Sequence, residues 1–160
     1  MKTIIIFGLI AICINGCNQS TSPSDRPLTT TFTLTDTNGQ MVSQFHSGEE
    51  FKLAFTLTNT TKDTLTFYRG STAPAVIFQI MKNDSVIASS VDGYDFLAVV
   101  LSGSVAPGQS LQGEWKAPNT PPQTPKVLLN PGSYQAKVLF PNFNQAKVNP
   151  VSLITFSVSP

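Results

Sequence analysis

The stretch FKLAFTLTNT, residues 51–60, decides the fold class. Aromatic and aliphatic side chains occupy every second position from 51 to 57, and smaller or polar residues stand between them. A period of two places one kind of side chain on each face of a β-strand, whereas a helix needs a period of 3.6. The stretch therefore predicts a strand with one buried face. The same alternation in TFTLTDT, residues 31–37, predicts a second strand.

The rest of the chain repeats this pattern of short strands separated by turns. Twelve prolines occur in 160 residues, and glycine, proline, asparagine and aspartate cluster between the apolar runs. No segment shows an apolar face with helical spacing. We therefore expect an all-β fold, an immunoglobulin-like antiparallel β-sandwich of about eight or nine strands. The further expected strands are residues 64–68, 75–81, 85–90, 96–101, 110–116, 133–140 and 151–158.

The amino terminus has the layout of a secretory signal peptide. An uncharged apolar run from Ile4 to Ile14 follows the positive Lys2. Eleven residues of helix would span only about 16 Å, roughly half the hydrocarbon thickness of a bilayer. The run therefore predicts export rather than a permanent membrane-spanning helix.

The run ends in INGC, residues 14–17, which resembles the lipobox of bacterial lipoprotein signal peptides. The resemblance implies cleavage after Gly16, diacylglycerylation of the Cys17 thiol, and an exported protein held in the cell envelope by lipid. If the source has two membranes, Asn18 in place of aspartate after the cysteine favours the outer one. The alternative is an ordinary signal peptide that is cut nearby, with Cys17 incidental.

The predicted organisation is a signal peptide over residues 1–16, a lipidated tether over residues 17–30 and a sandwich domain over residues 31–160. Residues 18–30 hold Leu28 as their single large apolar residue, too little to offset the entropy of ordering. Cleavage would leave Cys17 as the single cysteine, so a buried core rather than a disulfide must stabilise the domain. Ten basic and nine acidic residues nearly balance, and we expect no nucleic-acid partner and no cofactor.

The chain contains, in this order, the stretches FKLAFTLTNTTKDTLTFYRGS (51–71), VAPGQSLQGEW (105–115) and LNPGSYQAKVLF (129–140). Together they resemble the BsuPI-like domain, a family named for intracellular proteinase inhibitors of bacilli. The resemblance covers about 90 residues and implies a small β-sandwich. The family's Tyr-Asp pair and its tryptophans are missing from residues 70–90, so inhibition is the least transferable property. The matched residues within the three stretches are Asn59, Pro107, Gly108, Trp115, Pro131, Gly132 and Tyr134.

We interpret these matched residues as scaffold. Gly108 and Gly132 follow proline at turn positions that often need a positive φ. Trp115 and Tyr134 lie on expected strands, where a large ring can fill the space between sheets. Asn59 at a strand end can hydrogen-bond its own turn. The alternative for Trp115 is a surface platform for a sugar or a peptide.

Two places are candidate binding sites. The loop APNTPPQTPK, residues 117–126, contains Pro121 and Pro122, and its prolines forbid regular pairing. It is either a recognition loop or a stiff crossover between sheets. In VDGYDF, residues 91–96, Asp92 and Asp95 are candidate ligands for a calcium ion together with backbone carbonyls. The simpler interpretation is a turn whose aspartates cap local amides, because no third acidic residue lies nearby.

The sequence does not support catalysis. His46, the single histidine, is expected in an exposed loop, no Gly-x-Ser-x-Gly motif is present, and a zinc site would need more histidines or cysteines. We expect a non-catalytic envelope lipoprotein whose sandwich binds an unidentified protein in a structural or assembly role. Binding would use loops at one end, or a sheet edge that adds a strand. The alternatives are a proteinase-inhibitor-like module acting on a secreted or envelope protease, and a carbohydrate-binding module that uses exposed aromatic rings.

Overall fold

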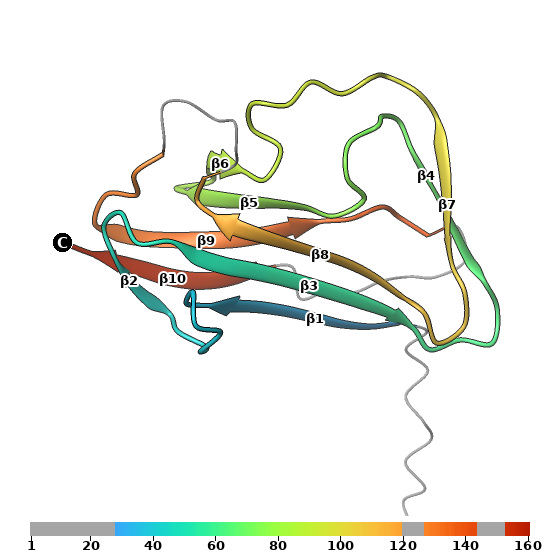
Figure 1. The fold of residues 1–160 in the computed structure, drawn as a ribbon, viewed down its shortest axis with the longest axis horizontal. Helices are drawn as coiled ribbons and strands as arrows, with labels where there is room; N and C mark the ends of the chain where they lie inside the picture. The colour runs from blue at the N-terminus through green and yellow to red at the C-terminus, as the bar shows by residue number, and fades with distance from the viewer. Residues whose placement is uncertain (1–27, 120–126, 144–152) are drawn as a thin grey trace, which may run out of the picture.

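The computed structural model describes residues 28–119, 127–143 and 153–160, and these fold into β-strands and loops (Figure 1). None of the three described ranges contains a helix suited to crossing a membrane. The prediction of an all-β antiparallel sandwich is confirmed, with ten strands rather than eight or nine in the described ranges. The strands are β1 (Leu28–Thr35), β2 (Gln44–His46), β3 (Phe51–Asn59), β4 (Leu65–Arg69), β5 (Ile77–Lys82), β6 (Ser85–Ser89), β7 (Leu101–Val105), β8 (Ser110–Ala117), β9 (Gly132–Leu139) and β10 (Leu153–Ser159).

The strands form three sheets. A three-stranded sheet has the order β1-β3-β8, and a five-stranded sheet has the order β2-β10-β9-β5-β6. A two-stranded sheet pairs β4 with β7 and projects beyond the end of the other two (Figure 1). Neighbouring strands are antiparallel except β2 and β10, which are parallel. β8 therefore lies at the edge of the first sheet, with β3 as its one partner among the described strands.

The core lies between the three-stranded and five-stranded sheets. Phe51 of β3 meets Phe156 of β10 with ring centroids 5.1 Å apart, and Phe55 stacks on Phe140 at 5.0 Å. Each such ring or aliphatic side chain contributes roughly 1.5–3 kcal/mol when fully buried. The alternation predicted for residues 51–57 is confirmed, because four side chains of β3 are at most 1% exposed: Phe51, Leu53, Phe55 and Leu57.

Two amino-terminal features differ from the expectations. The tether was predicted to reach residue 30, but β1 begins at Leu28, which is buried and pairs with Asn59. Backbone pairing with β3 thus orders a threonine-rich segment whose composition alone predicts disorder. β2 was not expected, and it places His46 on a strand rather than in a loop. The His46 side chain is exposed, as predicted, and its Nδ1 lies 3.0 Å from the Ser159 hydroxyl.

The strand expected at residues 96–101 is displaced along the chain. Leu97 and Val100 are 74% and 76% exposed, and the strand β7 follows them. The pairing of β7 with β4 brings Gly103 beneath the ring of Phe67, where a Cβ atom would lie 2.3 Å from the ring. The close contact between Gly103 and Phe67 therefore helps to set the position of β7 along the chain. The apolar run that precedes β7 lies on the surface.

Candidate functional site

The outer edge of β8 is the first element of a candidate binding site. A strand at a sheet edge presents backbone N–H and C=O groups with no strand partner. The side chains of Gln112, Glu114 and Lys116 are exposed, whereas Trp115 and Ala117 are buried. One face of β8 is thus packed in the core, while the side chains of Gln112, Glu114 and Lys116 on the other face are exposed to solvent.

A hollow of about 420 Å³ borders this edge. Four consecutive residues of β8, Gln112 to Trp115, line one side of it. Val76 and Phe78 also line it, as do Tyr94 and Phe96 from the connection between β6 and β7. We call this hollow the edge groove. It combines aromatic and aliphatic lining residues with a strand edge that has no strand partner in the part of the chain that the structure describes.

The connection between β6 and β7 is held against the body of the protein by Thr72. The Thr72 amide donates a hydrogen bond of 3.0 Å to the carbonyl of Leu97, and the Leu97 amide donates one of 3.0 Å to the Thr72 hydroxyl. Tyr94 and Leu97 nevertheless expose 48% and 74% of their surface. Exposed apolar side chains that gather beside a groove are typical of an interaction surface.

Gly113 permits the close approach that shapes the edge groove. A Cβ atom at position 113 would lie 2.6 Å from Cγ1 of Val76 and 3.3 Å from Cε2 of Phe78. Val76 is buried, so it cannot move aside without leaving the core. The glycine therefore lets Val76 pack directly under the edge strand.

Asp92 and Asp95 lie in the turn that follows β6. The Ser89 amide donates a hydrogen bond of 2.7 Å to Oδ2 of Asp92, and the Asp92 amide donates one of 3.2 Å to the Ser89 carbonyl. Asp92 is thus engaged in its own turn, and Asp95 is exposed. Within the described ranges no three His, Cys, Asp or Glu side chains gather closely enough to hold a metal ion.

The two rings interpreted as scaffold are both buried. Trp115 is 6% exposed and its Nε1 donates a hydrogen bond of 3.3 Å to the Asn119 carbonyl. Tyr134 is 3% exposed, and its hydroxyl donates a 2.7 Å hydrogen bond to the Asn130 carbonyl. Neither ring is available as an open platform for a sugar. Of the tyrosines considered for that role, Tyr68 is 60% exposed.

The remaining scaffold residues form turns. Pro107 and Gly108 are the central residues of a turn closed by a 2.9 Å hydrogen bond from the Gln109 amide to the Ala106 carbonyl. Gly108 has a φ of +74°, as the third residue of a type II turn requires. Gly132, after Pro131, has a φ of +146°, which other residues rarely adopt.

Four predicted site residues lie outside the described residues: Gly16, Cys17, Pro121 and Pro122.

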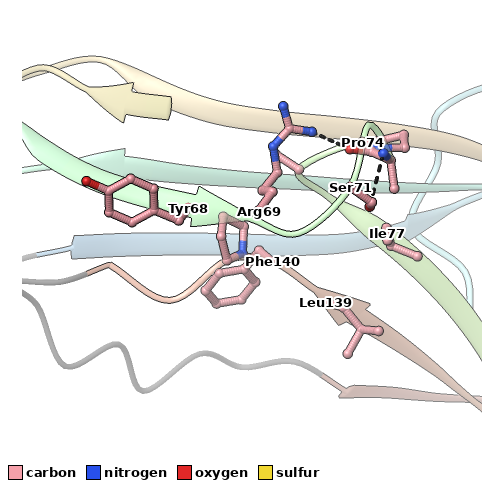
Figure 2. A pocket seen from close by; sticks show the side chains of 10 residues that line it. Tyr68, Arg69, Ser71, Pro74, Ile77, Leu139 and Phe140 are labelled. Atoms are coloured by element: carbon pink, nitrogen blue, oxygen red, sulfur yellow. Dashed lines mark hydrogen bonds between the residues drawn. The ribbon is translucent and has the colours of Figure 1, made fainter. Parts of the chain in front are cut away.

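A second hollow of about 270 Å³ lies at the end of β4 (Figure 2). Tyr68 and Arg69 line it together with the connection from Ser71 to Ala75, Ile77 of β5, and the end of β9 with the two residues that follow it, 139–141. Nη1 of Arg69 donates a hydrogen bond to the Ala73 carbonyl. We call this hollow the arginine pocket, and it shares Pro74 and Ala75 with the edge groove. Sequence reasoning missed it because its residues come from three separate segments with no common motif.

Comparisons with known proteins assign no family to the chain. No protein-family model matches it, and no curated protein matches it. An alkylpurine DNA glycosylase from Pseudomonas fluorescens bound to DNA containing an abasic site analog is 15% identical, with a TM-score of 0.42 over 84% of this chain and 31% of that chain. A β-glucosidase from Listeria innocua in complex with glucose is 9% identical, with a TM-score of 0.42 over 83% of this chain and 16% of that chain.

A CARDB domain from Pyrococcus furiosus is 14% identical, with a TM-score of 0.33 over 84% of this chain and 95% of that domain. The chain thus spans less than a third of the glycosylase and less than a fifth of the glucosidase. At these scores the likenesses carry no argument about activity. The resemblance to the BsuPI-like domain stays a prediction.

Proposed function

We propose that this chain is a non-catalytic, lipid-anchored envelope protein that binds an extended segment of a partner protein along β8, in a structural or assembly role. One observation carries the proposal: the edge of β8 that has no strand partner among the described strands borders the edge groove, whose lining also includes Tyr94 and Phe96. An edge of this kind accepts a strand from another chain through main-chain hydrogen bonds, and pockets for alternate side chains give specificity.

The arrangement favours a partner segment that alternates apolar and polar residues. Its apolar side chains would contact the aromatic and aliphatic part of the groove lining, and its polar side chains would lie beside Gln112 and Glu114, which also line the groove. Glu114 also faces Lys52, with Oε2 and Nζ 3.6 Å apart on an exposed surface. Exposed pairs of this kind contribute little to stability, so these side chains are free to rearrange around a partner.

The anchor is tested by the mass of the membrane-extracted protein. A chain that begins at Cys17 and carries two or three acyl groups supports the proposal, because several acyl chains are needed for stable anchoring. Cys17→Ser is the matched variant, and it should lose both the added mass and membrane retention. An unmodified, soluble product from the parent chain would reject the envelope anchor.

The binding edge is tested by photo-crosslinking in cells. A photoreactive amino acid at position 112, on β8, should give a discrete adduct with one protein, joined at an extended segment of that protein. The same amino acid at the exposed position Asn38, in the loop after β1, is the control and should not give that adduct. Equal adducts from both positions, or none from position 112, would reject strand addition at β8.

The same experiment separates the two functions expected from the sequence. If the crosslinked partner is a secreted or envelope protease, and stoichiometric protein slows it, then the inhibitor-like function replaces the assembly function. If the partner is not a protease, or is a protease whose rate is unchanged, the assembly function stands.

A further inference from the structure

The arginine pocket places one cation among apolar side chains. Its charged lining residue is Arg69, and the apolar residues around it include Ile77, Leu139, Phe140 and Pro74. Figure 2 shows the guanidinium turned toward the connection that contains Ser71 and Pro74, with Leu139 and Phe140 below it in the view. A cationic group beside an apolar hollow is the arrangement that recognises an anion carried on an apolar body.

Arg69 has no anionic partner among the residues that the structure describes. The ion pairs formed there join Lys52 to Glu114 and Lys116 to Glu50. Arg69 is half-buried, and its Nη1 donates to the Ala73 carbonyl, while its buried Nε has no hydrogen-bond partner within the described ranges. Removing a cation from water without a counter-ion is unfavourable. An incoming anion would offset that penalty.

We propose that the arginine pocket binds a carboxylate carried on an aromatic or branched apolar group. A guanidinium presents parallel N–H donors that match the two oxygens of a carboxylate. One cation balances one negative charge, so a carboxylate fits this pocket better than a phosphate dianion. The volume of about 270 Å³ lies just below the usual range for drug-sized ligands, which begins at roughly 300 Å³, so a single ring or branched side chain suits it.

Two sources supply this chemistry: a free small carboxylic acid, or the terminal carboxylate of a peptide chain that ends in an apolar residue. The second source is compatible with the edge groove, because both hollows are lined by Pro74 and Ala75. The pocket itself does not depend on the proposed strand addition, since its lining residues on β4, on β5 and at the end of β9 are separate from β8.

The test is a titration of the purified full-length protein with 3-phenylpropanoate, followed by calorimetry and by mapping of amide chemical shifts. We expect binding, with the largest shift changes at Tyr68, Ile77 and Leu139. The neutral amide 3-phenylpropanamide should bind at least roughly tenfold more weakly, because it cannot make a charge-assisted pair. Equal binding of acid and amide, shift changes centred elsewhere, or equally tight binding of inorganic phosphate would each overturn the proposal.

Variants test the role of Arg69 itself. Arg69→Gln should weaken 3-phenylpropanoate binding by roughly tenfold, whereas Lys62→Gln, which removes an exposed cation from the turn after β3, should not. Equal effects of the two variants would overturn the proposal. If Arg69→Gln fails to fold, the comparison of acid with amide on the parent protein still decides.

A peptide that ends in phenylalanine distinguishes the two sources. Tighter binding of its free acid than of both its terminal amide and 3-phenylpropanoate assigns the site to a chain terminus. Binding of 3-phenylpropanoate without binding of the peptide assigns it to a small acid. Failure of every carboxylate, with the adduct at position 112 intact, would reject this pocket and leave the strand-addition function standing.

Discussion

The side-chain amide of Asn59 donates a hydrogen bond of 2.8 Å to the carbonyl of Val105 and thereby ties the end of β3 to the end of β7. The same amide nitrogen donates to the Asp63 carbonyl at 2.8 Å, and Oδ1 accepts hydrogen bonds from the amide and the hydroxyl of Thr61. Asn59 is fully buried, and both donors and both acceptor sites of its side chain are used. One residue therefore joins its own turn to a strand more than 40 positions away.

Asn59→Ala should lower the free energy of unfolding by about 2–4 kcal/mol, because it removes the side-chain donor to the buried Val105 carbonyl and the acceptor for Thr61. Urea denaturation measures this loss. Thr58→Ala is the matched control, since Thr58 is on the same strand and its exposed hydroxyl bonds Ser110 at 2.8 Å. It should cost less than about 1 kcal/mol. A loss for Asn59→Ala no larger than that of the control would contradict the network described above.

Gly113→Ala should destabilise the protein by about 1–3 kcal/mol, because the new methyl group would overlap Val76. Gly70→Ala is the control: its Cβ atom would have no neighbour within 4 Å, and we expect little change. In a protein that already carries Val76→Ala, Gly113→Ala should cost less stability than it does in the parent protein, because the truncated side chain at position 76 leaves room for the new methyl group. Additive losses in this double-mutant cycle, measured by thermal unfolding, would show that the two sites do not touch.

Tyr134→Phe should cost about 1 kcal/mol, because it removes the hydrogen bond from the Tyr134 hydroxyl to the Asn130 carbonyl while it leaves the buried ring in place. Tyr68→Phe is the control, since that side chain is 60% exposed, and it should have no measurable effect. Comparable losses for the two variants in urea denaturation would argue against a structural role of the Tyr134 hydroxyl.

Alternation along the chain was sufficient to predict most strands. A residue pattern with a period of two is a local property, and burial on one face of β3 follows from it directly. β2 escaped prediction because three residues are too few to show a period. The position of β7 could not be predicted either. It depends on Gly103 fitting beneath Phe67, which is a contact between residues far apart in the sequence.

The candidate site was harder to predict than the fold. An unpaired edge is a property of sheet order, and nothing in the β8 sequence says that β3 is its one neighbour among the described strands. The edge groove combines Gln112 with Phe96 and Val76, and the arginine pocket combines Arg69 with Phe140. Binding at a sheet edge was among the expectations from the sequence, but the candidate binding residues were Pro121, Pro122, Asp92 and Asp95.

Trp115 is the single tryptophan of the chain and lines the edge groove, so its fluorescence should report what happens there. Because the ring is 6% exposed, its emission should be blue-shifted and acrylamide should quench it weakly in the native state. Phe96→Ala removes part of the groove wall and should increase quenching by acrylamide. Leu97→Ala is the control, since Leu97 is 74% exposed and does not line the groove, and it should leave quenching unchanged.

A partner segment that lies along β8 should protect Trp115 further, and this protection should be weaker in Phe96→Ala than in Leu97→Ala. An added strand would cover the edge beside the indole and remove the path by which acrylamide reaches it. A partner that crosslinks at position 112 but leaves Trp115 quenching unchanged would bind the exposed face of β8 rather than the groove. That outcome would move the interface away from Phe96 and Val76.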